Sequence, residues 1–232
     1  MGINLKQMAA ARAVEMVTNG MVLGLGTGST ARYAVEMIGE RLRDGRLRDI
    51  VGVPTSSETE RIAKEVGIPL TTLREHPVID LTIDGADEVD PHLALIKGLG
   101  GALVHEKIVA RASRRVVIIV DDSKLVQVLG TKAPLPVEVI PFGWGTYLKQ
   151  LKGFGCEPVL RMRGTEPYVS DEGNYIVDCR FARIEDPAKL ECALNCIPGV
   201  VDNGLFIGLA SMVIVASESG VRELRCNKNP SF

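Results

Sequence analysis

The chain has 232 residues, of which 46% are hydrophobic and 24% are charged, as is typical of a globular protein that buries a large core. Its formal net charge of −2 offers no basic field, so we expect no nucleic-acid partner. No apolar run approaches the roughly 20 residues of a membrane helix, and the N-terminus lacks the apolar run of a signal peptide. We therefore expect a cytoplasmic protein without a membrane partner.

The cysteines and histidines show no spacing typical of a metal site. The five cysteines include no CxxC pair, and none lies near a histidine in the sequence. We expect reduced thiols and no bound metal. The residues concerned are Cys156, Cys179, Cys192, Cys196, Cys226, His76, His92 and His105.

Strands and helices alternate along the first 130 residues. The pattern predicts strands at 21–25, 50–53, 81–83 and 116–120, and helices over 5–18, 31–38 and 58–65 and through Glu106 and Ala110. This alternation is typical of an α/β fold, in which a parallel sheet carries helices on both faces. Ligands of such sheets bind beyond the carboxyl ends of the strands, and four polar or glycine-rich loops follow those ends here.

From residue 133 onward, prolines separate shorter apolar runs, which indicates a second, smaller α+β domain. Its predicted elements are extended runs at 137–141, 157–162, 174–181 and 199–206, with helices at 147–152 and 187–195. The apolar run 210–216 is expected to return to the first sheet. The sequence thus predicts one domain from 1–130 plus 207–232, and a second from 131–206.

The loop from Gly24 to Thr30 joins a predicted strand to a helix. Its glycines allow a close backbone approach to an anion, and the helix N-terminus supplies free amides, so a phosphate site is one interpretation. It has neither the Gly-Lys-Ser/Thr ending of a Walker loop nor the third glycine of a dinucleotide loop. The alternative is a tight turn in which Ser29 or Thr30 caps the helix.

The acidic cluster Asp84-Gly85-Ala86-Asp87-Glu88 follows a buried strand. Crowded carboxylates shift each other's pKa values and suit proton transfer. A calcium loop does not fit, because Ala86 and Val89 stand where a ligand and a glycine are required. An acidic turn in solvent remains an open alternative.

A third loop, residues 97–101, contains three glycines and leads into the helix that carries Glu106. This glutamate is a candidate base, although an acid in the first turn also simply favours the helix dipole. His105 is a second candidate base, or else a surface residue. Lys97 and Lys124 are candidate phosphate or oxyanion partners, with ordinary solvated lysines as the alternative.

Together these motifs resemble the ribose-5-phosphate isomerase A family along the whole chain. The segments that carry the resemblance are GLGTGSTA, DGADEVD, KGLGGALVHEKIVA, DDSKLV and PLPVEVIPF, in this order and spacing. The resemblance implies a Rossmann-like parallel-sheet domain with a smaller ferredoxin-like α+β domain. It also implies an aldose-ketose isomerase that interconverts D-ribose 5-phosphate and D-ribulose 5-phosphate through a cis-enediolate, in the non-oxidative pentose phosphate pathway. The resemblance further implies that the enzyme uses neither a cofactor nor a metal and that it forms a homodimer or homotetramer.

The resemblance also assigns roles to individual residues. Glu106 matches the catalytic base, Asp84 a group that assists ring opening, and Asp87 and Lys97 the groups that order hydroxyls and stabilise the oxyanion. Many family members have three consecutive glycines after the lysine, whereas Leu99 interrupts that run here. The expected substrate-binding residues are Thr27, Gly28, Ser29, Thr30, Gly85, Ala86, Gly98, Leu99, Gly100, Lys124 and Lys6.

Two alternatives share such a fold: a sugar-phosphate-sensing regulator, and another enzyme, either an aminosugar-phosphate deaminase or a coenzyme A transferase. A sugar-phosphate-sensing regulator would carry a DNA-binding module, but only one helix precedes the first predicted strand here. An aminosugar-phosphate deaminase would use a histidine in its proton relay, and a coenzyme A transferase would be a much longer protein. The sequence therefore favours the isomerase.

Overall fold

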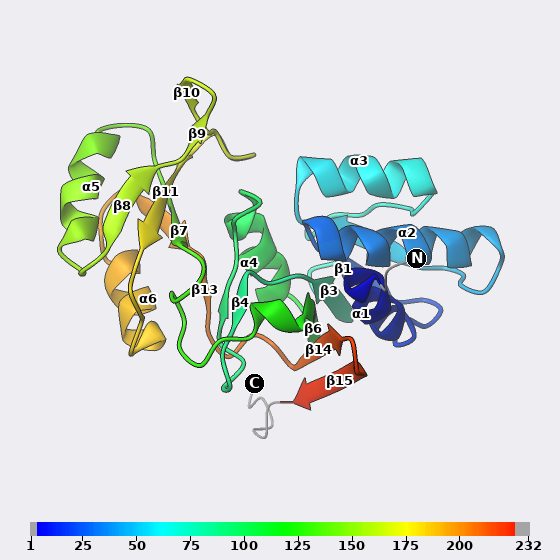
Figure 1. Ribbon diagram of the computed structural model, residues 1–232. Helices are drawn as coiled ribbons and strands as arrows, with labels where there is room; N and C mark the ends of the chain where they lie inside the picture. The colour runs from blue at the N-terminus through cyan, green and yellow to red at the C-terminus, as the bar shows by residue number, and fades with distance from the viewer. Residues whose placement is uncertain (1–3, 226–232) are drawn as a thin grey trace. The chain divides into compact units, whose positions relative to one another are not determined.

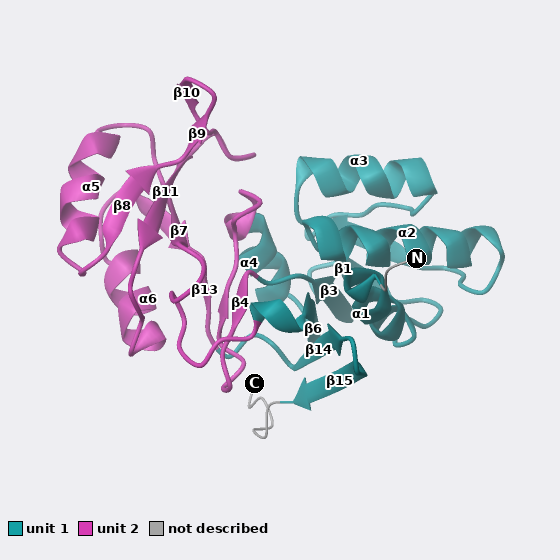
Figure 2. Ribbon diagram, viewed as in Figure 1, with its two compact units in different colours: residues 1–86, 105–124, 208–232 teal, residues 87–104, 125–207 magenta. Residues whose placement is uncertain are grey.

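The computed structural model describes residues 4–225, which form two compact units (Figure 1, Figure 2). Among the described residues, the first unit comprises 4–86, 105–124 and 208–225, and the second comprises 87–104 and 125–207. The sequence assigned 87–104 to the first domain, but this stretch groups with the second unit, because its β5 (Leu95–Ile96) pairs with β13 (Leu205–Phe206).

A six-stranded sheet forms the centre of the first unit, in the order β15-β14-β6-β3-β1-β2. All neighbouring strands are parallel except β14 and β15. The strands are β1 (Val22–Leu25), β2 (Val51–Pro54), β3 (Leu81–Asp84), β6 (Val116–Asp121), β14 (Met212–Ser217) and β15 (Gly220–Arg225). The helices are α1 (Leu5–Val14), α2 (Ser29–Arg43), α3 (Ser57–Val66), α4 (Leu103–Arg111) and the short 3-10 helix η1 (Asp122–Lys124).

Helices cover both faces of this sheet, as the strand-helix alternation predicts. Leu23 and Leu25 of β1 pack in one core cluster with residues of α1, α2 and α3. On the opposite face, Val109 of α4 packs against Val53 and Ile79. Strands buried on both faces favour nearly continuous apolar sequence, which is the pattern that β6 shows, while β3 is also buried throughout but contains Thr82 and Asp84.

The topology places a ligand-binding position beside β1. This strand has β2 on one side and β3 on the other, so the connections that follow β1 and β3 diverge from a topological switch point. Ligands of open α/β sheets bind at such points, beyond the carboxyl ends of the strands. The loop that contains Thr27 follows β1, and Asp84 ends β3.

The second unit contains a four-stranded antiparallel sheet in the order β12-β7-β11-β8. Its chain order is β7 (Leu135–Val139), α5 (Trp144–Lys152), β8 (Glu157–Leu160), β11 (Tyr175–Arg180), α6 (Pro187–Asn195) and β12 (Val200–Asn203). The spatial order of the four strands is therefore 4-1-3-2, that of a ferredoxin-like domain, so the predicted fold class is confirmed. The remaining strands are β4 (Glu88–Val89), β5, β9 (Met162–Arg163), β10 (Glu166–Pro167) and β13.

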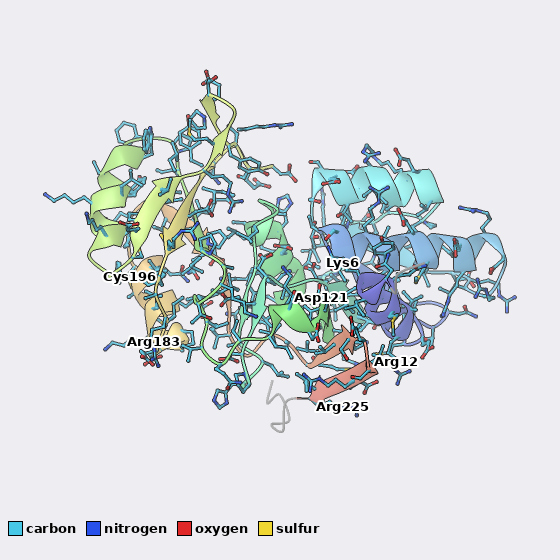
Figure 3. The ribbon with its side chains drawn as sticks, viewed as in Figure 1. Lys6, Arg12, Asp121, Arg183, Cys196 and Arg225 are labelled. Carbon is cyan, nitrogen blue, oxygen red and sulfur yellow. The ribbon has the colours of Figure 1, made fainter. Side chains whose placement is uncertain are left out.

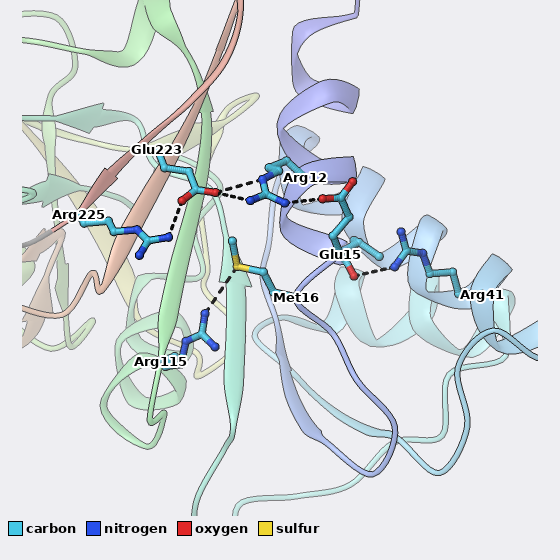
Figure 4. Close-up of polar contacts among 8 residues, drawn as sticks. Arg12, Glu15, Met16, Arg41, Arg115, Glu223 and Arg225 are labelled. Atoms are coloured by element: carbon cyan, nitrogen blue, oxygen red, sulfur yellow. Dashed lines mark hydrogen bonds and ion pairs between the residues drawn. The ribbon is translucent and has the colours of Figure 1, made fainter.

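The first and last described elements of the chain are joined by ion pairs (Figure 4). Arg12 of α1 donates to Glu223 of β15 through Nε (3.0 Å) and Nη2 (2.7 Å), and Arg225 donates to the other oxygen of Glu223 (2.8 Å).

The apolar run 210–216 does return to the first sheet, as predicted, where β14 pairs with β6. The helix predicted over 5–18 is shorter in the structure, where α1 ends at Val14.

Four of the five cysteines lie among the described residues, and all four are free thiols: Cys156, Cys179, Cys192 and Cys196. Cys226 lies outside the described residues. Within residues 4–225, no helix is long and apolar enough to cross a membrane, and no group of three or more His, Cys, Asp or Glu side chains is arranged to hold a metal ion.

Candidate functional site

The predicted site residues are distributed over both units. In the first unit, Asp84 and the loop after β1 are joined directly. The carboxylate oxygen Oδ1 of Asp84 accepts hydrogen bonds from the backbone amides of Thr27 (3.1 Å) and Gly85 (2.7 Å). Asp84 is only 2% exposed, so the alternative of an acidic turn in solvent is wrong for this residue. A buried carboxylate held by two amides has a fixed direction, as a catalytic group requires.

The loop after β1 has the geometry of an anion site. Gly28, with φ of +102°, precedes α2 as its N-cap and provides no side chain to cap the helix. Ser29 is already helical, so neither it nor Thr30 is the N-cap, and that alternative is wrong. The hydroxyl of Ser29 accepts a hydrogen bond from Nζ of Lys6 (2.8 Å), on α1 (Figure 3). A helix N-terminus, a hydroxyl and an ammonium group thus lie together, and each attracts a phosphate.

Lys6, Gly28 and Ser29 also line a cavity of about 550 Å³ in the first unit. Tyr33 and Thr59 are among its other lining residues. The volume lies within the usual range for small-ligand sites.

A cluster of hydroxyl groups supports this loop, and the sequence did not assign it a role. Oγ1 of Thr27 lies 2.7 Å from that of Thr55, 2.8 Å from Oγ of Ser56 and 3.1 Å from Oγ1 of Thr59. Thr55 also donates to the carbonyl of Leu25, at the end of β1 (2.9 Å). The only sequence signal for the cluster is that several hydroxyl residues follow β2, the strand beside β1.

Glu106 lies in the first turn of α4 and is 5% exposed. An acid whose role was only a favourable interaction with the helix dipole would lie in solvent. Burying a carboxylate costs more free energy than that interaction provides. Burial therefore favours the interpretation of Glu106 as a functional group over that alternative. His105, the other candidate base, is partly exposed and lines a separate cavity beside Thr71 and Ile108.

In the second unit, Asp87 and Lys97 lie at neighbouring ends of a small three-stranded sheet. The amide of Asp87 donates to the carbonyl of Ile96 (2.8 Å), and that of Lys97 donates to the carbonyl of Gly204 (2.9 Å). Lys97 is 3% exposed, and its Nζ lies 5.5 Å from the centroid of the Phe206 ring. Burial against an aromatic face holds a lysine ammonium in a defined place.

The backbone of Leu99, rather than its side chain, takes part in this arrangement. Its amide donates to Oδ2 of Asp87 (3.0 Å), while the residue is 41% exposed. A leucine in place of a glycine at this position therefore leaves the backbone N–H able to donate a hydrogen bond, as it does to Asp87. Gly98 precedes it with φ of +102°, and Gly100 follows it at the surface.

The remaining predicted residues occupy strand ends. Lys124 lies in η1, directly after β6, which is the parallel neighbour of β3. Asp121, labelled in Figure 3, ends β6. Gly85 and Ala86 follow β3 and join Asp84 to Asp87 along the sequence.

Comparisons with known proteins show the family of this chain. Residues 51–220 match the family described as ribose 5-phosphate isomerase A (phosphoriboisomerase A). A ribose-5-phosphate isomerase A of Gloeobacter violaceus is 57% identical, over 97% of this chain and 98% of that one.

Two solved structures are also similar over almost their full length. A D-ribose-5-phosphate isomerase in complex with phospho-erythronic acid has a TM-score of 0.94 at 43% identity, covering 96% of this chain and 100% of that one. The ribose 5-phosphate isomerase of Plasmodium falciparum has a TM-score of 0.94 at 41% identity, covering 97% and 99% respectively. The resemblance seen in the sequence motifs is thereby confirmed, and the chain belongs to the ribose-5-phosphate isomerase A family.

Proposed function

We propose that Glu106 is the base with which this ribose-5-phosphate isomerase moves a proton between C1 and C2 of its substrate. The observation that carries the proposal is that Glu106, which the resemblance matches to the family's catalytic glutamate, is a buried carboxyl group on α4. In the forward direction Glu106 takes the proton from C2 of the ring-opened aldehyde form of ribose 5-phosphate. A cis-enediolate forms, the proton of the C2 hydroxyl passes to the oxygen on C1, and the same carboxyl returns its proton to C1, which gives D-ribulose 5-phosphate.

Asp84 assists opening of the furanose ring in this proposal. Its position is supported by the two amides that fix Oδ1 and so orient the carboxylate. A carboxylate in hydrogen-bond reach of the ring hydroxyl exchanges the proton that ring opening requires.

The phosphate of the substrate binds at the start of α2, in the loop Thr27-Gly28-Ser29-Thr30. The contact between Lys6 and Ser29 supports this assignment, because it places a cation at the helix N-terminus before any phosphate is bound. Lys124, after β6, is the second cation that we assign to the substrate.

Charge that develops on the substrate oxygens is stabilised by Lys97 and by the backbone of Gly98 and Gly100, while the N–H of Leu99 holds the carboxylate of Asp87. Asp87, with the neighbouring backbone of Gly85 and Ala86, orders the hydroxyl groups. Removal of one oxyanion donor typically costs ~3 to 4 kcal/mol of barrier, which is a factor of hundreds in rate. A solved relative binds phospho-erythronic acid, whose carboxylate resembles the two oxygens of the enediolate.

The proposal is tested with Glu106→Gln, which keeps the size of the side chain and removes the base. We expect kcat for ribose 5-phosphate to fall by a factor of about 10³ or more, since general base catalysis contributes up to about 10⁴. Binding of phospho-erythronic acid, measured by calorimetry, should persist. The matched control is Glu65→Gln on the exposed face of α3, which should keep full activity. Wild-type turnover in Glu106→Gln would remove Glu106 from this role.

The cellular setting that we propose is the non-oxidative pentose phosphate pathway in the cytoplasm. We also propose a homodimer or homotetramer. Its support is the group of exposed apolar side chains on the second unit, where Phe142 is 87%, Val159 62% and Val169 54% exposed. Light scattering of the purified protein measures its mass in solution.

A further inference from the structure

Arg161 follows β8 directly and belongs to none of the motifs that carry the family resemblance. Its guanidinium is held by Asp178, a residue of the neighbouring strand β11. Nε of Arg161 donates to Oδ2 of Asp178 (2.9 Å), and Nη2 donates to Oδ1 (2.5 Å). Their side chains are 13% and 24% exposed. Two parallel hydrogen bonds to one carboxylate fix the plane of the guanidinium as well as its position.

The remaining terminal nitrogen of Arg161 reaches the glycine-rich loop. Nη1 donates to the carbonyl oxygens of Gly98 (3.1 Å) and Leu99 (3.0 Å). One cation in a fixed plane therefore holds two successive carbonyl groups of the loop. A lysine has no such planar fork and could not make the paired contact to Asp178 at the same time.

The peptide group between Gly98 and Leu99 links Arg161 to a proposed catalytic residue. Its carbonyl accepts from Arg161, while its N–H, which belongs to Leu99, donates to Oδ2 of Asp87 (3.0 Å). The C=O and N–H of a trans peptide point in opposite directions, so the cation and the carboxylate lie on opposite sides of this peptide. A cation at the carbonyl also polarises the peptide and strengthens its N–H as a donor.

The next peptide is oriented in the same way. Arg161 holds the carbonyl of Leu99, so the N–H of Gly100 points away from the guanidinium. Two successive N–H groups of the loop thus face away from the guanidinium: that of Leu99 donates to the carboxylate of Asp87, and the exposed one of Gly100 suits an anionic oxygen.

Tyr168 holds the far end of the loop. Its ring lies 5.7 Å from Cζ of Arg161, and its hydroxyl donates to the carbonyl of Gly100 (3.5 Å). Burial raises the pKa of Tyr168, which keeps the hydroxyl protonated as a donor. Gly101, with φ of +87°, passes so close that a Cβ there would lie 2.1 Å from this hydroxyl.

We propose that Arg161, fixed by Asp178, is a positioning residue for the isomerisation. It sets the direction of the Leu99 and Gly100 amides, and through the Leu99 amide it sets the direction of the Asp87 carboxylate. Arg161 itself touches no substrate. The inference rests on the proposed role of Asp87 and of the loop amides in catalysis.

The first test compares Arg161→Gln and Asp178→Asn with Arg163→Gln, a control at an exposed arginine two positions along the sequence. Misplacement of catalytic groups by about 1 Å costs about 10²-fold in rate, so we expect kcat to fall about 10- to 100-fold in both test variants. KM for ribose 5-phosphate should change less than about threefold, because the phosphate is bound by the first unit. Arg163→Gln should match wild type.

Arg161→Lys separates positioning from stability. It keeps the positive charge but not the planar guanidinium that makes the paired contact to Asp178. We therefore expect kcat to stay low even if the melting temperature returns to the wild-type value. Wild-type kcat in Arg161→Lys or Asp178→Asn would overturn the proposal, as would a lowered melting temperature with unchanged kcat in Arg161→Gln.

A double-mutant cycle with Asp87→Asn identifies the route of action. If Arg161 acts through Asp87, the double variant should lose little more activity than Asp87→Asn alone. If the losses in kcat of the two single variants instead multiply in the double variant, that route is contradicted. Full activity of Asp87→Asn by itself would instead refute the role proposed for Asp87, and kcat of Arg161→Gln would still decide whether Arg161 positions the loop amides.

Discussion

Asp84 owes its position to the absence of a side chain at Gly26. A Cβ built on Gly26 would lie 2.3 Å from Oδ1 of Asp84 and 2.5 Å from its Cα. The second contact is with backbone and cannot be relieved by a rotation of the side chain. The protein therefore needs glycine at this position so that the amide of Thr27, one residue later, can reach the carboxylate.

We predict that Gly26→Ala lowers both stability and activity. The methyl group must displace β3 or the loop after β1, and overpacking of this kind costs about 1–3 kcal/mol of the free energy of unfolding. Because Asp84 moves with the strand, kcat should fall as well. Urea denaturation and the isomerase assay measure the two effects.

Gly145 in α5 provides the matched control for this substitution. A Cβ there meets nothing within 4 Å, and its helical position favours alanine by ~1 kcal/mol. Gly145→Ala should therefore stabilise the protein slightly and leave kcat unchanged. Equal behaviour of the two variants would show that the close approach at Gly26 has no consequence.

At the scale of elements, Glu88 ties β4 to a distant loop. Its side chain is completely buried, and its two oxygens accept hydrogen bonds from the amides of Gly130 (2.6 Å), Lys132 (2.5 Å) and Ala133 (2.6 Å). Three donors converge on one carboxylate, and Asp87 is the preceding residue. This glutamate of the acidic cluster thus has a structural function.

We predict that Glu88→Gln destabilises the second unit by about 2–4 kcal/mol. The amide of glutamine offers one oxygen, so at least one backbone N–H would face an NH₂ group and lose its acceptor. Each buried donor left unsatisfied costs about 1–3 kcal/mol. A fall in melting temperature would be the readout, and an unchanged melting temperature would refute the structural role. Glu172→Gln, at an exposed turn, is the control.

The parts of the fold that the sequence predicted are those with periodic apolar patterns. β1, β3, β6 and α3 lie within one or two residues of their expected bounds. β4 and β5 have two residues each, too few to show a period, and β15 is a polar edge strand. Their pairing depends on contacts between distant segments, which a local pattern does not contain.

The same distinction applies to the candidate site. Glycine-rich and acidic loops are local signals, so Asp84 and the loop at Thr27 were candidates from the residues themselves, whereas Glu106 was favoured as the base only through the family resemblance. Arg161 was not a candidate, because an arginine after a strand is usually a surface residue. Only the folded sheet reveals that Asp178 fixes its guanidinium and that Gly98 accepts from it.

At the scale of the molecule, Glu223 joins the last strand of the first unit to its first helix. Hydrogen bonds from Arg225, and then from Arg12, hold the pKa of Glu223 below its ordinary value of 4.5. A carboxyl with a lowered pKa in the folded state contributes stability above the unfolded pKa. That contribution is lost as the pH falls through the folded value, below about 4.5.

We predict that Glu223→Gln lowers the free energy of unfolding at pH 7 by at most about 1 kcal/mol, since the pair is at the surface. The difference from wild type should shrink as the pH falls through the lowered pKa of Glu223 and vanish once the wild-type carboxyl is protonated too. Urea denaturation at a series of pH values from 7 downward measures this. A difference that does not shrink with falling pH would show that Glu223 acts by packing, and Glu218→Gln in the neighbouring turn should have no effect at any of these pH values.

The order of strands in the first sheet has a consequence for synthesis on the ribosome. β6 is followed by the whole of residues 125–207 before β14 appears, so a nascent chain can complete the ferredoxin-like sheet while β6 still lacks its outer neighbour. Until β14 emerges from the ribosome, the free edge of β6 is a pairing surface for other unfolded chains. The emergence of β14 and β15 thus covers this edge, and it determines when the nascent protein loses that route to aggregation.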